Sequence, residues 1–366
     1  MRAVPLPMLC ISLAALLVTA GASAQRCGCG MGAELHWPAR MQRSDGSWPA
    51  SAAASEDVAE HEQVKEQRPA DGGQSNQEGL VPLLPGDAYA HQPQDLHVTA
   101  LYALALSADG SNLRSGPGRI RLKNAVRWVR GQQDKHGRFG FSVHPDWLVD
   151  HALVTTMLAE VAAHSRYSIL HAPVDRALQV LRQHLGRVDS ADVEVLVWAR
   201  MATAAGRLMP DAVRSLQAEP ARSEFLARLD ALDDAVVRLA PAAVLDVDAT
   251  DRRKVGAGVL LTSLLTDRGA HAPAVDVSWL DSAEHPLATT YYAIASFRAG
   301  GLCWKEMSKR LEACMVKSAD DRLPFARTWA PRGRYGEAYG RLGMTATSVL
   351  TLTLYYRYAR LAVCDV

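Results

Sequence analysis

The feature that most constrains the fold of this chain is the alternation of two kinds of helical segment. Segments 97–108 and 147–164 are apolar around almost their whole circumference, whereas segments 119–133 and 174–185 are amphipathic and basic. A helix that is apolar on all sides is buried, while a helix with one apolar stripe faces water on its other side. The alternation therefore predicts an inner ring of helices wrapped by an outer ring, an α/α barrel whose repeats pack mainly on their neighbours.

The helical periodicity continues along nearly the whole chain after residue 94. Apolar residues recur at three- and four-residue steps, and Gly, Pro or Asp separates the segments. No run of alternating β-branched residues competes with this pattern. The sequence predicts an all-α fold with helices over 97–108, 119–133, 147–164, 174–185, 190–206, 221–240, 252–266, 285–300, 302–317 and 344–361.

A short phrase recurs where one helical pair gives way to the next. It reads QRSDGSW at 42–48 and, more loosely, QDKHGRF at 133–139. The glycine of each phrase suits a turn with positive φ, and the aspartate can bond to nearby backbone. The glutamine can satisfy carbonyl or amide groups left open at a helix end, and the aromatic ring can fold under the next repeat. We interpret the phrase as a structural joint between consecutive helical pairs.

This phrase resembles the QW repeat of the squalene–hopene cyclase and prenyltransferase-like α/α toroid superfamily. The segments AVRWVRGQQDKHGRFGF, DWLVDHALVTTMLAE and GRLGMTATSVLTLTLYYRYARL are similar to a branch of exported bacterial proteins with prenyltransferase/squalene-oxidase repeats. The resemblance covers nearly all of the chain outside 50–93. It implies an α/α toroid with inner and outer rings of helices.

The catalytic motifs of that superfamily are incomplete in this chain. The cyclases protonate their substrate with a D-x-D-D motif, but the nearest text, DVDA at 246–249, lacks the last acid. The DALDD segment at 230–234 has the wrong spacing and is expected on the solvated face of an outer helix. Cyclase cavities need many aromatic rings, yet the chain has only five Phe. The zinc ligands of the prenyltransferases and the Gly-Cys-Gly-Glu-Gln of the thioester proteins are also missing. We therefore expect no metal and no cofactor, and favour a protein that is not an enzyme.

The N-terminus has the features of a secretion signal. A basic residue precedes a short apolar stretch that ends in Ala22-Ser23-Ala24, which predicts cleavage before Gln25 and export to the periplasm or the exterior. An uncleaved anchor is the alternative. No later stretch reaches about 18 apolar residues, so no membrane span is expected after cleavage.

The predicted division is a signal peptide at 1–24, an N-terminal segment with the first repeat at 25–49, a low-complexity insertion or linker at 50–93, and the toroid domain at 94–366.

Charge and cysteine content set further limits. The net charge of +1 provides no field that would attract nucleic acid.

Cys303 and Cys314 are expected on one helix about 16 Å apart, too far for a disulfide. Since a closed ring brings its ends together, Cys27 or Cys29 is a candidate partner of Cys364. Pairing with Cys303 and free thiols are the alternatives.

Three of the expected inner helices begin with a histidine next to an acid. They read Asp95-Leu-His97, Asp150-His151 and Glu284-His285. Because inner helices of an α/α barrel run in the same direction, these starts should share one mouth, where three imidazoles could hold zinc with an open position. The alternative is that each acid caps its helix and each histidine is neutral and hydrogen-bonded beneath a loop. Tyr292 follows His285 by seven residues and shares its face. The candidate ligand-binding residues are His97, Asp150, His151, His285 and Tyr292.

Two functions remain open at this point. An intact scaffold without complete catalytic motifs favours an exported binding or scaffold module for a lipid-like, peptide or glycan ligand or for a protein partner. The alternative is an enzyme of the toroid superfamily, either isoprenoid-processing or a hydrolase or lyase at a histidine-lined cavity mouth.

Overall fold

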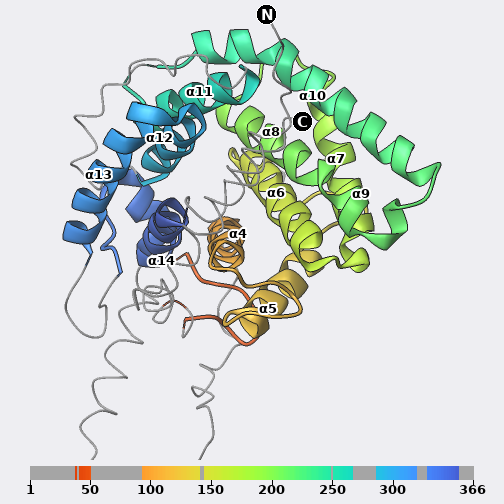
Figure 1. Cartoon of the computed structure of the whole chain (residues 1–366), viewed down its shortest axis with the longest axis horizontal. Coiled ribbons are helices and arrows are strands. Elements are labelled where there is room, and N and C mark those ends of the chain that lie inside the picture. The colour runs from red at the N-terminus through yellow and green to blue at the C-terminus, as the bar shows by residue number, and fades with distance from the viewer. Residues whose placement is uncertain are drawn as a thin grey trace, which may run out of the picture.

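The computed structural model describes residues 38, 41–50, 93–140, 144–248, 250–266, 286–319 and 328–353 (Figure 1). The expected signal peptide, residues 51–92 of the expected insertion, and the candidate residues Cys27, Cys29, His285 and Cys364 lie outside these ranges. Within them the protein is helical and contains no strand, so the predicted all-α class is confirmed for this part of the chain.

Most of the helices begin and end close to the predicted positions. They are α4 (Pro93–Ala108), α5 (Arg119–Gly131), α6 (Trp147–Ser165), α7 (His171–Leu185), α8 (Val193–Arg207), α9 (Met209–Ala212), α10 (Ala221–Leu245), α11 (Arg252–Leu265), α12 (Pro286–Ala299), α13 (Gly301–Ser318) and α14 (Gly333–Leu352), with 3-10 turns η2 (Ser168–Leu170) and η3 (Arg214–Leu216).

Three helices differ from the prediction, and one of them, the four-residue α9, was not expected at all. Helix α10 continues through Pro241 to Leu245. Helix α14 begins at Gly333 and bends at Gly340, whose φ of 62° and ψ of −171° are not helical. The part of α14 beyond this bend contains the start of the segment that the sequence predicts at 344–361.

The two kinds of helix differ in burial as the sequence predicts. In α6 every residue from Val149 to Ala163 is buried. In α5 and α7 the buried residues form a stripe with three- and four-residue spacing, such as Leu122, Ala125 and Val129. The first kind is enclosed by neighbouring helices, and the second covers it.

The enclosed helices contact one another in a closed cycle. Helix α4 contacts α6, and the cycle continues through α8, α11, α12 and α14, which contacts α4 again. Helix α5 packs on α4, α7 on α6, α10 on α8 and α13 on α12. Figure 1 shows α5, α7, α10 and α13 lying outside the helices of the cycle. The first turns of the cycle helices meet through side chains, as shown below.

The repeated phrase forms the joints of this arrangement. In each joint the glutamine amide donates to the carbonyl of the joint's own glycine and to a carbonyl of the next outer helix. The bonds are Gln42 Nε2 to the Gly46 oxygen and to the Arg121 oxygen, both 2.9 Å, and Gln133 Nε2 to the Gly137 oxygen at 3.2 Å and to the Pro173 oxygen at 2.9 Å. The prediction of a structural joint is confirmed, with the acceptors in the turn and in the following outer helix.

The glycines of the two joints are required for conformation and for space. Their φ values are 101° at Gly46 and 88° at Gly137. A Cβ atom on Gly46 would lie 2.3 Å from the carbonyl oxygen of Asn124, and one on Gly137 would lie 2.8 Å from Cβ of Arg176. Only glycine allows the turn to approach the outer helix this closely.

The aromatic residue of each joint is tied to the next inner helix through its backbone. The bonds are Trp48 N–H to Thr99 Oγ1 at 2.9 Å, Phe139 N–H to His151 Nδ1 at 3.0 Å and Trp329 N–H to Thr345 Oγ1 at 3.3 Å. Each aromatic ring is buried. The third joint, at Trp329, was not predicted from the sequence.

The expectation that the acids at 230–234 lie on a solvated face is wrong for Asp233. This residue is 9% exposed and accepts hydrogen bonds from Arg200 and Arg207 of α8 and, at 2.6 Å, from Thr203. Burial alone would raise the pKa of the Asp233 carboxyl, but these hydrogen bonds outweigh it and hold the pKa below its ordinary value. The carboxylate therefore fastens α10 to α8.

Two further expectations, on the cysteines and on membrane spans, can be compared with the described residues. Both Cys303 and Cys314 lie in α13, and Cys303 is exposed with a free thiol. Among the helices that the structure describes, none combines the length and the apolar character needed to cross a bilayer.

Candidate functional site

A buried histidine–aspartate pair joins the first turns of α4 and α6. His97 Nδ1 lies 2.8 Å from Asp150 Oδ1. The His97 side chain has no exposed surface, and Asp150 is 4% exposed. Because a carboxylate can only accept, the shared proton belongs to Nδ1 of the imidazole.

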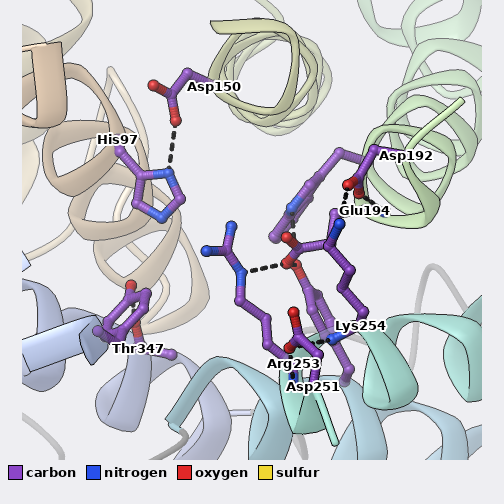
Figure 2. Close-up of polar contacts among 11 residues, drawn as sticks. His97, Asp150, Asp192, Glu194, Asp251, Arg253, Lys254 and Thr347 are labelled. Carbon is purple, nitrogen blue, oxygen red and sulfur yellow. Dashed lines mark hydrogen bonds and ion pairs between the residues drawn. The ribbon is translucent and has the colours of Figure 1, made fainter. Parts of the chain in front are cut away.

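Two ion pairs join the starts of α8 and α11. Arg253 Nε donates to Glu194 Oε1 at 2.6 Å, and Lys254 Nζ lies 2.7 Å from Asp192 Oδ2. The N-cap residues position both partners, because Asp192 accepts from the Glu194 N–H and Asp251 accepts from the Arg253 N–H. Figure 2 shows the side chains of Arg253 and His97 extending toward one another from opposite sides of the cluster.

Glu194 is held by a chain of buried donors. Trp198 Nε1 donates to the Tyr291 hydroxyl at 3.1 Å, and that hydroxyl donates to Glu194 Oε1 at 2.8 Å. Burial and the neighbouring Glu194 charge raise the pKa of Tyr291 well above its ordinary value. Burial acts to lower the pKa of Arg253, but the Glu194 carboxylate together with Tyr291 and Tyr339 outweighs it and raises the pKa, so the guanidinium remains charged.

Two tyrosines of α14 complete the cluster. The Tyr339 ring stacks on His97 with centroids 4.4 Å apart, and the Tyr335 ring lies 4.6 Å from that of Tyr339. The Tyr335 hydroxyl lies 2.9 Å from Thr347 Oγ1. Burial raises the pKa of both phenols, so both are neutral at physiological pH.

His151, adjacent to Asp150, serves a joint and faces away from this cluster. Its Nδ1 accepts the Phe139 N–H, so Nε2 carries the proton and donates to the Ala177 oxygen of α7 at 3.1 Å. Burial lowers the pKa of His151 to about 4. This residue fits the alternative of a neutral, hydrogen-bonded histidine beneath a loop.

The remaining predicted site residues are placed as follows. Tyr292 is buried in α12, and a Cβ atom on Gly256 of α11 would lie 3.3 Å from its Cε2, so the ring packs on the backbone of α11. His285 lies outside the described residues. The structure thus brings His97 and Asp150 together and directs His151 elsewhere.

Two side chains of the cluster, those of His97 and Arg253, have polar nitrogen atoms without a hydrogen-bond partner in the described part of the chain. His97 Nε2 is buried and makes no hydrogen bond. Arg253 uses only Nε, and its side chain is 24% exposed, so its two Nη atoms are open to another partner. Over the described ranges, no group of three or more His, Cys, Asp or Glu residues is arranged to hold a metal ion.

Sequence reasoning missed Glu194 and Arg253. Both stand two residues after an aspartate at the start of a helix, in Asp192-Val-Glu194 and Asp251-Arg-Arg253, which is the spacing of Asp95-Leu-His97. This Asp-x-X spacing is the signal in the sequence that marks both residues.

Comparison of the chain with protein-family models, with curated proteins and with solved structures gave no match.

Proposed function

We propose that the chain is an exported α/α toroid of the squalene–hopene cyclase and prenyltransferase-like kind, which binds a ligand at one mouth of its ring. The alternation of enclosed and striped helices, the closed cycle of contacts and the repeated joints support this assignment. The predicted signal peptide at 1–24 supports export to the periplasm or the exterior.

The observation that carries the proposal is the unpartnered Nε2 of His97 in a fully buried ring. Leaving a buried polar atom without a hydrogen bond costs about 1–3 kcal/mol, so most such atoms in folded proteins have a partner. Stability alone does not favour this arrangement. A ligand that enters the mouth supplies the missing partner.

The chemistry of the mouth narrows the range of ligands. Its groups are a guanidinium, an imidazole, carboxylates and phenols, which recognise hydrogen-bonding ligands. Of the ligand classes that the sequence leaves open, a peptide or a glycan fits these groups better than a lipid-like molecule.

Ligand-observed NMR with a library of small polar compounds tests the proposal, using the full chain as purified after export. We expect compounds that bind to the wild type and bind more weakly to His97→Gln, while their binding to Arg228→Gln on the outer helices is unchanged. If every compound that binds does so equally to wild type and His97→Gln, the mouth is not the binding site.

An enzyme is the second candidate, and the geometry of the His97–Asp150 pair favours it. Asp150 holds the Nδ1 proton, so the Nε2 lone pair is available to accept a proton from a bound substrate, the arrangement of a general base. Incubating each bound compound with the protein and following its NMR spectrum tests this activity. Chemical change with the wild type but not with Asp150→Asn supports an enzyme, and unchanged ligand supports a binding module.

A further inference from the structure

We propose that the ligand carries a carboxylate that binds to the two Nη atoms of Arg253, and a hydroxyl that donates to Nε2 of His97. This inference rests on the proposed ligand-binding mouth and specifies the chemical class of its ligand, an organic acid that also bears a hydroxyl group.

The guanidinium of Arg253 is fixed in orientation before any ligand binds. Its Nε donates to Glu194 Oε1, which also accepts from the Tyr291 hydroxyl, and Tyr291 in turn accepts from Trp198. These contacts occupy the Nε side of the guanidinium and leave both Nη atoms for a ligand. Two parallel N–H groups of a guanidinium match the two oxygens of a carboxylate in distance and direction. A pre-oriented fork also loses less conformational freedom on binding.

The charges around Arg253 favour a single negative charge over a phosphate. Lys254 is paired with Asp192, and Glu194 is paired with Nε of Arg253 itself. A phosphate group carries close to two negative charges at neutral pH and would be repelled by these carboxylates more strongly than a carboxylate would. The first turns of α4, α6, α8 and α11 meet here, and the positive ends of their dipoles favour one anionic group.

His97 selects the second group of the ligand. Because Nδ1 carries the ring proton toward Asp150, Nε2 offers its lone pair as an acceptor. The Tyr339 ring stacked on the imidazole holds its plane in place. A ligand hydroxyl satisfies Nε2, whereas an aliphatic acid leaves it unpaired.

The test follows the side-chain Nε–H signals of the arginines in a two-dimensional ¹H–¹⁵N spectrum of the full chain as purified after export. Arg228 is an internal reference, because its Nε also donates to a carboxylate, Asp175 Oδ1 at 2.9 Å, with a side chain 32% exposed. The probes are glucuronate, its neutral counterpart glucose, and inorganic phosphate. We expect glucuronate to shift the Arg253 signal saturably with a dissociation constant of about 1 mM, and to leave the Arg228 signal in place.

Matched variants assign the contacts, with binding followed by calorimetry. Arg253→Gln should abolish glucuronate binding, Arg228→Gln should leave it unchanged, and His97→Gln should weaken it about 2- to 12-fold, the value of one hydrogen bond.

The outcomes separate this inference from the proposed function. Glucose binding at the mouth as tightly as glucuronate would overturn the carboxylate but leave the binding site standing. Phosphate binding more tightly than glucuronate would overturn the choice of carboxylate. Equal shifts of the Arg253 and Arg228 signals would reveal ionic screening and contradict the inference, as would glucuronate leaving the Arg253 signal unmoved.

Discussion

At the scale of single residues, two neighbouring side chains of α6 show what the sequence can and cannot specify. The sequence predicts that Asp150 and His151 lie near the start of an inner helix, and they do. Consecutive residues on a helix point about 100° apart. Asp150 therefore faces His97 of α4, while His151 faces the joint and α7. Which of the two faces His97 depends on the rotation of α6, and adjacent letters in a sequence do not reveal it.

The pKa of His151 predicts how stability responds to acid. The folded pKa of about 4 lies below the ordinary value of 6.5, so the unfolded chain binds more protons between these values. The contribution of His151 is thus fully present above pH 6.5 and is lost as the pH falls toward 4, by roughly 3 kcal/mol. In His151→Thr, which copies Thr99 and Thr345 of the other joints, this part of the pH dependence should vanish. Denaturant unfolding of both proteins at several pH values checks the difference, and parallel curves would contradict it.

At the scale of elements, periodicity located most helices, and the discrepancies at α10 and α14 have local causes. The prediction ended α10 before Pro241 because proline usually ends or bends a helix, yet the helix continues. The start of α14 was missed because the glycine-rich segment 333–340 has low helix propensity. The joints were predictable because their glycines, glutamines and aromatics are local signals. The pairing of Glu194 with Arg253 was not, since it depends on which helices become neighbours.

Two buried tryptophans, one in a joint and one in α5, should contribute strongly to stability. Trp48 is fully buried and donates from Nε1 to the Pro38 oxygen at 2.7 Å, and Trp128 in α5 is 7% exposed. Replacing either tryptophan with alanine should lower the free energy of unfolding by about 3–5 kcal/mol. Chemical denaturation measures the loss, with exposed Ile120→Ala as the control. An unchanged midpoint for Trp48→Ala would mean that its joint does not hold the repeats together, and one for Trp128→Ala would mean that this ring contributes little to the packing of α5.

The contact between α8 and α10 should depend on the charge of Asp233. Asp233→Asn leaves Arg200 and Arg207 without their shared carboxylate and should cost roughly 2–4 kcal/mol, with solvent screening of the partly exposed arginines reducing the loss. Because the folded pKa is lowered, this contribution is present above the unfolded pKa of about 3.9 and disappears as the pH falls through the folded value. The difference in stability between wild type and variant should therefore shrink at low pH. A difference that is independent of pH would show that the carboxylate charge is not responsible.

At the scale of the whole molecule, the cycle of helices places its first and last described members side by side. Helix α4 contacts α14 although they are the ends of the cycle in sequence. The sequence predicts this closure only through the alternation of enclosed and striped helices. The position of the cluster around His97 follows from these contacts between helices, because His97 of α4 meets both Asp150 of α6 and Tyr339 of α14.

Closure also motivates the predicted disulfide between Cys364 and either Cys27 or Cys29, all of which lie outside the described residues. The bond would close a loop across nearly the whole chain and stabilise it by about 4–5 kcal/mol, less any strain. Peptide mapping of the exported protein under non-reducing conditions should recover the linked peptides. Recovery of Cys364 as a free thiol would exclude the bond.

We propose that the His97–Asp150 pair serves a ligand and is not needed for the fold. The free energy of unfolding of the double variant His97→Leu with Asp150→Leu tests this most directly. Replacing both partners of a buried hydrogen bond with apolar groups of similar volume is often neutral or stabilising, and here it also removes an unpaired Nε2. We expect the double variant to have a free energy of unfolding at least as large as that of the wild type. His151→Leu, which leaves the Phe139 N–H and the Ala177 oxygen without their partner, should lose about 2–4 kcal/mol. A loss of about 3 kcal/mol or more in the double variant would show that the pair holds the ring together, and would contradict the claim.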